Sequence, residues 1–182
     1  EYNKIKYNDY ISLTTGYDYV KPLDEDVEYF HNIIKEIMPD KNDRKTLMHY
    51  YCSALFGINN QKFVIMTGRG GNGKGILNEI FKRTTGNMGF KLKTSCIQSI
   101  QKDGASPAMA GIHKKRFVVA SEPPDAKPLE VSIIKDLTGG NTGTGRMLYS
   151  NVTEFINIAS VCCECNNKPP INGIADNAIN RR

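Results

Sequence analysis

The stretch KFVIMTGRGGNGKG, from Lys62 to Gly75, carries the strongest structural signal in this chain. Its first part, Phe63 to Met66, is a short apolar run, long enough for one buried β-strand. Its second part spaces Gly68, Gly73 and Lys74 as G-x-x-x-x-G-K. Glycines allow backbone N–H groups to approach a polyphosphate closely, at φ and ψ angles that other residues avoid. The stretch therefore predicts a strand, a phosphate-binding loop and a helix, in that order.

The loop matches the phosphate-binding loop of P-loop NTPases. The predicted helix, from residue 73 to about 83, directs the positive end of its dipole at the phosphates. In P-loop NTPases the residue after the lysine is Ser or Thr, whose hydroxyl holds Mg²⁺, but here it is Gly75. A flexible glycine-rich turn is the alternative, which the order of strand, glycines, lysine and helix disfavours. We expect eight residues to bind the nucleotide: Gly68, Arg69, Gly70, Gly71, Asn72, Gly73, Lys74 and Gly75.

Length and composition set the outer limits. The chain has 182 residues, of which 40% are hydrophobic, and this is typical of one domain of ordinary size. No apolar run approaches the ~18 residues that a membrane-spanning helix needs, so we expect no membrane association. The first residues, EYNKIKYNDY, are not a signal peptide, and the chain begins without Met, so we expect a fragment.

The five cysteines are odd in number and come without a secretion signal, which indicates a reducing compartment. Cys162, Cys163 and Cys165 fall in the apolar run ASVCCECN. They lack the C-x₂-C pairing of structural zinc sites. We therefore predict buried strand cysteines rather than a metal centre.

Charge is divided unevenly along the chain. Residues 1–60 carry 7 basic and 10 acidic side chains, whereas residues 61–182 carry 17 basic and 9 acidic ones. The excess of positive charge in the second part favours an anionic partner, which would be the nucleotide and, with it, nucleic acid. Ordinary surface lysines are the alternative.

Composition divides the chain into an arm or linker (1–23), a helical hairpin (24–57) and a P-loop core (58–182). In the hairpin, apolar residues at helical spacing predict a first helix over residues 24–38. A second helix is predicted to begin at a cap, Asn42 or Asp43, and to run through Phe56.

The core alternates strand and helix patterns. RFVVAS, over residues 116–121, predicts a second buried strand, and a helix is predicted over residues 129–137. Residues 155–165 form a third long apolar run. This alternation predicts an α/β fold with a mostly parallel sheet.

Polar residues follow two of the predicted strands, where open parallel sheets bind their ligands. Glu122 follows RFVVAS, in the position where P-loop NTPases place the acid that handles Mg²⁺ or the attacking water. Asn166 follows ASVCCEC, and its amide offers a donor and an acceptor together. Each residue also precedes prolines, so an ordinary turn is the alternative at both positions.

Four motifs occur in order: GRGGNGKG, RFVVASE, IKDLTGGNTGTGRMLY and CNNKPPINGIADNAINRR. Together they resemble superfamily III helicases, and most of all the helicase–primases of large cytoplasmic DNA viruses and the primases of phages and plasmids. The resemblance covers residues 44–182. It implies an AAA-like P-loop NTPase fold.

The resemblance assigns roles to single residues of the predicted active site. Lys74 would bind phosphate, and Glu122 would be the catalytic acid and a metal ligand. Asn166 would be the polar sensor. Arg181 and Arg182 match a terminal arginine pair, one member of which serves as an arginine finger.

The resemblance also implies a surface that binds nucleic acid. Lys135, Thr138 and Arg146 match a motif that precedes a DNA-contacting hairpin. Arg146 and Tyr149 are the candidates for a channel that holds single-stranded DNA, although either could equally be a solvated hairpin residue. Asn141 replaces an Asp of the family pattern, which removes a charge from this loop.

The family implies a ring of identical subunits, usually a hexamer, that hydrolyses ATP with Mg²⁺ and moves along single-stranded DNA during replication. If the protein is viral, it would act in the host cytoplasm. Two alternatives stay open. One is another P-loop phosphotransferase, such as a kinase. The other is a nucleic-acid-binding ring component in which Gly75 has abolished hydrolysis.

Overall fold

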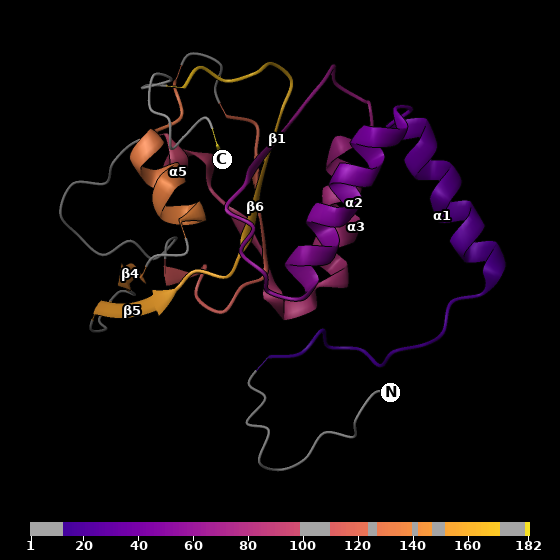
Figure 1. Cartoon of the computed structure of the whole chain (residues 1–182), viewed down its shortest axis with the longest axis horizontal. Coiled ribbons are helices and arrows are strands. Elements are labelled where there is room, and N and C mark those ends of the chain that lie inside the picture. Colours follow the sequence, from indigo (N-terminus) through magenta and orange to yellow (C-terminus); the bar gives the residue numbers. More distant parts are fainter. Residues whose placement is uncertain (1–12, 99–109, 124–126, 140–141, 147–151, 172–180) are drawn as a thin grey trace, which may run out of the picture.

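A four-stranded parallel sheet forms the centre of the computed structural model, which describes residues 13–98, 110–123, 127–139, 142–146, 152–171 and 181–182 (Figure 1). Its strands lie in the order β1 (Phe63–Thr67), β6 (Ser160–Cys165), β3 (Phe117–Ser121) and β2 (Gly89–Leu92). The predicted α/β class with a mostly parallel sheet is confirmed.

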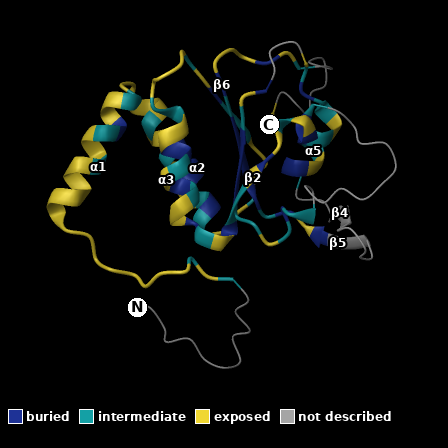
Figure 2. Cartoon of the chain, turned by 180° about the vertical axis from the view of Figure 1, so that it is seen from behind, coloured by how far each residue is buried: buried dark blue, intermediate teal, exposed yellow. Residues whose placement is uncertain are grey.

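Helices cover both faces of the sheet. On one side lie α1 (Asp24–Ile37), α2 (Lys41–Leu55) and α3 (Lys74–Thr84), and on the other lies α5 (Val131–Thr138) (Figure 1). Two short 3₁₀ turns, Gly86–Met88 and Thr94–Ile97, flank β2. Figure 2 shows that burial is concentrated where the sheet and helices meet, and that α1 is mostly exposed.

The two faces of the sheet have different cores. On the side of α2 and α3, the ring of Tyr51 stacks on that of Phe81 at 4.2 Å between centroids, and Phe117 packs edge-on against both. On the side of α5 the buried side chains are mainly aliphatic, and Ile134 and Leu137 belong to this second cluster. Both clusters draw on β3 and β6, so these two central strands tie the layers together.

The hairpin of α1 and α2 is part of this packing. Tyr50, Tyr51 and Ala54 of α2 are buried in the same cluster as side chains of α3 and the sheet. The predicted cap of α2 was wrong. Asp40 caps the helix, because its carboxylate accepts hydrogen bonds from the backbone N–H groups of Asn42 and Asp43 at 2.8 and 2.9 Å.

The third apolar run does not form one strand. It is divided between β5 (Val152–Ile156), which pairs antiparallel with β4 (Thr142–Arg146), and β6 of the main sheet. The break lies at buried Asn157, whose side-chain oxygen accepts a hydrogen bond from the N–H of Ala159 and whose amide donates to the carbonyl of Leu137. A side chain that bonds its own backbone two residues on favours a turn over a continuous strand.

The cysteines of β6 are buried, as predicted. Burial raises the pKa of the Cys163 thiol to about 12, so the thiol stays protonated at neutral pH. Within the described ranges, no group of three or more His, Cys, Asp or Glu side chains is placed to hold a metal ion. The described helices include none that combines the length and apolarity needed to cross a membrane.

Candidate nucleotide-binding site

The loop between β1 and α3 requires glycine at two positions. Gly73 has φ +83°, and a Cβ added there would lie 2.6 Å from the side chain of Ile37 in α1. Gly68 has φ +152°, and its Cβ would lie 2.2 Å from the amide nitrogen of Asn72. The sequence therefore folds into a tight loop that larger residues could not form, and α1 packs directly behind it.

Lys74, the first residue of α3, turns its side chain back over the loop. Its Nζ donates to the carbonyl of Gly68 at 2.6 Å, to the side-chain oxygen of Asn72 at 2.8 Å and to the carbonyl of Arg69 at 3.3 Å. These contacts fix the ammonium group at the mouth of the loop. The positive charge thus lies beside the N-terminus of α3, where both the helix dipole and the backbone N–H groups favour an anion.

Residues from three strand ends meet at this loop. A cavity of about 390 Å³ is lined by Gly70 to Ile76, by Glu122 after β3, and by Glu164, Cys165 and Asn166 at the end of β6. The backbone N–H of Gly68 donates to the carbonyl of Asn166 at 3.3 Å, which joins the loop to the end of β6. The structure therefore brings Lys74, Glu122 and Asn166 together, as the sequence predicted.

Glu122 has an unusual backbone. Its φ is +53°, in the left-handed region that costs energy for any residue with a Cβ. Its N–H donates to the carbonyl of Glu164 at 2.8 Å, which ties the residue to the neighbouring strand. The side chain is exposed at the cavity. Strain of this kind at the mouth of a cavity is typical of functional sites.

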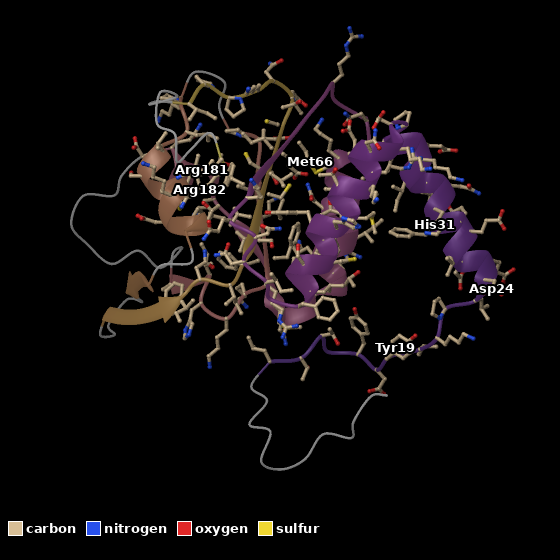
Figure 3. All side chains as sticks on the ribbon, in the orientation of Figure 1. Tyr19, Asp24, His31, Met66, Arg181 and Arg182 are labelled. Carbon is tan, nitrogen blue, oxygen red and sulfur yellow. The ribbon has the colours of Figure 1, made fainter. Side chains whose placement is uncertain are left out.

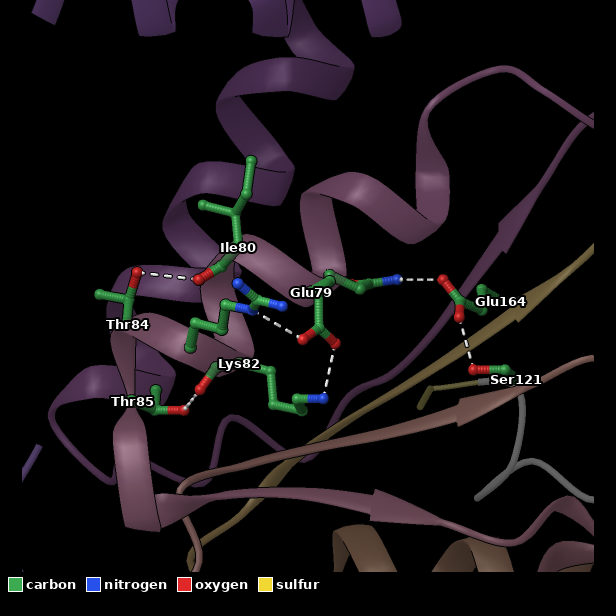
Figure 4. A network of polar contacts seen from close by, with 9 residues as sticks. Glu79, Ile80, Lys82, Thr84, Thr85, Ser121 and Glu164 are labelled. Atoms are coloured by element: carbon green, nitrogen blue, oxygen red, sulfur yellow. Dashed lines mark hydrogen bonds and ion pairs between the residues drawn. The ribbon is translucent and has the colours of Figure 1, made fainter. Parts of the chain in front are cut away.

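Glu164 is a site residue that sequence reasoning missed. Its carboxylate accepts hydrogen bonds from the hydroxyl of Ser121 and from the side-chain amide of Asn78, the latter at 3.0 Å (Figure 4). A Cβ added at Gly75 would lie 3.6 Å from its Oε2 atom. The available signal was a single acidic residue inside a run of buried strand residues, VCCEC.

Two carboxylates at the cavity suit a divalent cation. Glu122 and Glu164 line the cavity together with the glycine-rich loop between β1 and α3. Mg²⁺ prefers oxygen ligands and is held in nucleotide sites by one or two carboxylates together with phosphate oxygens and water. The residues present therefore fit an Mg²⁺-nucleotide complex, even though Gly75 has no hydroxyl.

Neither arginine of the pair lines this cavity, but Arg182 lines a neighbouring space of about 680 Å³ that also reaches Asn72 and Lys74. The carbonyl of Arg182 accepts a hydrogen bond from the N–H of Phe63, at the start of β1, at 2.9 Å. The loop follows the other end of this strand, which is about 13 Å away. Arg182 Nε donates to the hydroxyl of Thr138 at 3.0 Å, whereas Arg181 is exposed. Figure 3 shows both arginines on the side of α5.

The candidate nucleic-acid residues are spread over two elements. Lys135 is half-buried on α5. Arg146 is the last residue of β4 and pairs with Val152 at the start of β5, so it lies where the two strands of the hairpin are joined. Tyr149 lies outside the described residues.

Two curated viral proteins are similar in sequence over nearly the whole chain. The first is described as "Putative helicase L207/L206" of Acanthamoeba polyphaga mimivirus; it is 34% identical over 96% of this chain and 19% of its own length. The second is "Primase D5" of Fowlpox virus (strain NVSL), 28% identical over 94% of this chain and 23% of its own length. The chain thus spans about a fifth of these relatives. No protein-family model matches the chain.

A solved structure shares the fold. The C-terminal region of NrS-1 superimposes with a TM-score of 0.63 over 89% of this chain and 37% of its own, at 16% sequence identity. Together with the two viral proteins, this likeness confirms the resemblance to viral helicase–primases that the four motifs indicated.

Proposed function

We propose that this chain is the core of an ATP-dependent, superfamily III helicase that acts in DNA replication. The observation that carries this proposal is the meeting of Lys74, Glu122 and Asn166 at one cavity, each delivered by a different strand end. The names of the viral relatives point in the same direction. Action in the host cytoplasm stays a prediction.

ATP would lie with its phosphates over the loop between β1 and α3. Lys74 would exchange its contacts with loop carbonyls for phosphate oxygens and would neutralise charge that develops in the transition state. Mg²⁺, when bound, neutralises the β- and γ-phosphates. Glu122, exposed at the cavity, would orient the attacking water and accept its proton, and Asn166 would hydrogen-bond the water or the γ-phosphate.

One arginine of the pair, Arg181, would complete the site of a neighbouring copy. Arg181 is exposed, and its neighbour Arg182 bonds the start of β1, which at about 13 Å in length leads to the loop. A guanidinium can stabilise the γ-phosphate only when it lies close to it. A closed ring, which for this family is usually a hexamer, would bring Arg181 of one copy to the cavity of the next.

Single-stranded DNA would bind on the side of the β4–β5 hairpin. The chain beyond residue 60 carries 17 basic and 9 acidic side chains, and the proposed contacts are Lys135, Arg146 and Tyr149. Basic groups would neutralise the DNA backbone and aromatic rings would stack on bases.

The experiment that tests this proposal measures ATP hydrolysis by the intact protein with and without single-stranded DNA. We expect hydrolysis that requires Mg²⁺ and rises when DNA is added. Nucleotide binding without hydrolysis would favour the ring component in which Gly75 abolishes turnover. Phosphate transfer to an added acceptor, without DNA stimulation, would favour a kinase-like enzyme.

A variant separates the DNA contact from the nucleotide site. Arg146→Ala should weaken DNA binding. It should also reduce the slope of log affinity against log salt concentration by about 0.7, the value for one phosphate contact on a single strand. Arg83→Ala, which removes an exposed arginine of α3, is the matched control and should change neither quantity. An unchanged salt slope in Arg146→Ala would move the DNA site elsewhere.

A further inference from the structure

We propose that Glu164 holds the divalent cation of the bound nucleotide, in place of the hydroxyl that is missing at Gly75. This inference rests on the proposed nucleotide site and assigns its metal ligand. It concerns a residue that none of the four sequence motifs singled out as functional.

Glu164 occupies an unusual place for a carboxylate. It is the second-to-last residue of a central strand, β6. Its neighbours Cys163 and Cys165 are 0% and 3% exposed. The glutamate itself is half-buried and lines the cavity. A carboxylate in such a position costs desolvation energy, so a site that keeps one needs partners that repay this cost.

The partners of Glu164 among the described residues are neutral. Ser121 donates to Oε1, and Asn78, which is 1% exposed, donates to Oε2. Asn78 is fixed in turn by the hydroxyl of Tyr51, which donates to its side-chain oxygen at 2.8 Å. The ion pairs of the described residues join Lys82 and Arg83 to Glu79, so none involves Glu164. The negative charge is thus oriented without being neutralised.

This arrangement leaves the carboxylate able to bind a cation. Among the described residues, Oε1 accepts one hydrogen bond from Ser121 and Oε2 one from Asn78, and a carboxylate oxygen can accept more than one. Asn78 and Ser121 come from α3 and β3, so two elements set the direction of the group (Figure 4). Outer-shell hydrogen bonds of this kind are how metal sites orient their ligands.

The position relative to Gly75 identifies the cation as that of the nucleotide. Gly75 follows the phosphate-binding lysine, in the place from which a Ser or Thr hydroxyl holds Mg²⁺ in P-loop NTPases. A Cβ at Gly75 would lie 3.6 Å from Oε2 of Glu164, in ordinary van der Waals contact. The carboxylate therefore reaches the space that a hydroxyl from residue 75 would enter.

Glu122 and Glu164 then have different roles at the cavity. Their backbones are joined by the hydrogen bond from the N–H of Glu122 to the carbonyl of Glu164. Glu122 is the exposed, strained residue, suited to handle a water molecule, and Glu164 is the half-buried, oriented one, suited to hold a cation.

The test measures metal-dependent binding rather than turnover. A fluorescent, non-hydrolysable ATP analogue is titrated against the intact protein in EDTA and at increasing Mg²⁺, and Mn²⁺ binding to the complex is followed by electron paramagnetic resonance. In Glu164→Gln, we expect unchanged or tighter binding in EDTA, because a negative charge near the phosphates is removed. The Mg²⁺ or Mn²⁺ needed for half-maximal effect should rise about 10-fold or more.

Two controls make this result specific. Glu79→Gln removes a carboxylate from the exposed side of α3, where Glu79 pairs with Lys82 and Arg83, and it should leave the metal requirement unchanged. In the Glu164→Gln background, Gly75→Ser should restore part of the metal dependence, because it returns the hydroxyl. Gly75→Ala adds the same Cβ without the hydroxyl and should restore nothing.

The outcomes separate this inference from the function on which it rests. Analogue binding that fails in the wild type at all Mg²⁺ concentrations overturns the nucleotide site itself. Analogue binding with the same metal requirement in wild type and Glu164→Gln overturns only the role of Glu164. If Glu164→Gln does not fold, Glu164→Asp decides: it keeps the charge but withdraws the carboxylate by one methylene, so a metal requirement equal to that of the wild type contradicts the proposal.

Discussion

β1 leads at its carboxyl end into the glycine-rich loop that we propose binds phosphate, and at its amino end it bonds the backbone of Arg182. At the carboxyl end, the ammonium of Lys74 faces the cavity and is held by three acceptors of its own loop. At the amino end, Arg182 is bonded to Thr138, while Arg181 is exposed to solvent. We therefore propose that the first end acts within one chain and that the second offers the charge of Arg181 to a neighbouring copy.

The largest effect should come from Arg181. We expect Arg181→Ala to lower the rate of ATP hydrolysis by about 10³-fold or more while nucleotide affinity stays unchanged, since an arginine finger contributes about 10³–10⁵ to the rate. Steady-state hydrolysis and equilibrium binding measure the two quantities. Lys45→Ala is a control that removes an exposed positive charge from α2 and should leave the rate of hydrolysis unchanged.

Mixing variants tests whether Arg181 acts on a neighbouring copy. Arg181→Ala and Lys74→Ala proteins should each be inactive alone and should recover activity when mixed, because some interfaces then combine an intact lysine with an intact arginine. Hydrolysis per subunit should also rise with protein concentration in the wild type. If activity does not recover in assemblies shown to be mixed, Arg181 does not act on a neighbouring copy. Lys74 and Arg181 would then both act within their own chain.

The second effect belongs to the other end of the strand. Lys74→Ala should reduce hydrolysis by about 10²-fold, since the transition state loses one charge stabiliser. Unlike the Arg181 effect, this loss should also appear as weaker nucleotide binding at every protein concentration. Lys82→Ala, on the same helix but paired with Glu79, should bind nucleotide normally. Wild-type turnover in Lys74→Ala would show that the loop is not the active site.

The two ends of β1 also differ in how well the sequence predicts them. The carboxyl end of β1 was predictable because its strand, glycines, lysine and helix are consecutive, so local chemistry defines them. Glu122 and Asn166 were predictable because parallel strands end at one edge. The different positions of Arg181 and Arg182 were not, since they depend on a hydrogen bond between Phe63 and a residue 119 positions later in the chain.

Two other features were hidden for related physical reasons. The side chain of Asn157 breaks an apolar run into two strands by bonding to the N–H of Ala159 and the carbonyl of Leu137. Glu164 was missed because its value as a ligand depends on Asn78 and Ser121, which are distant in the sequence. In both cases one polar side chain inside an apolar run has a role that only its tertiary partners reveal.

The third effect concerns the arginine that stays within its chain. Arg182→Ala should lower the free energy of unfolding by about 1–2 kcal/mol, because the hydrogen bond from its charged side chain to Thr138 is lost. Urea unfolding measures this loss. The rate of hydrolysis should fall far less than in Arg181→Ala. A drop as large as that of Arg181→Ala would show that Arg182 is the finger and that its bond to Thr138 is exchanged on assembly.

The smallest effect should come from the hydroxyl of Tyr51, which lies behind the carboxyl end of β1. Tyr51 stacks on Phe81 and donates to Asn78, and burial raises the pKa of its hydroxyl, so it remains a donor at any physiological pH. Tyr51→Phe keeps the ring but leaves the buried oxygen of Asn78 without this donor, which should cost about 1 kcal/mol of unfolding free energy.

The same change should also loosen the group that Asn78 positions. If Asn78 orients Glu164, Tyr51→Phe should raise the Mg²⁺ needed for nucleotide binding by a few-fold, a weaker form of the outer-shell effects known in metal sites. Thr138→Val removes a hydroxyl from behind the other end of β1 and should cost similar stability with no change in the Mg²⁺ requirement. Equal metal requirements in Tyr51→Phe and Thr138→Val would mean that the hydrogen bonds from Tyr51 to Asn78 and from Asn78 to Glu164 stabilise the fold but do not position a metal ligand.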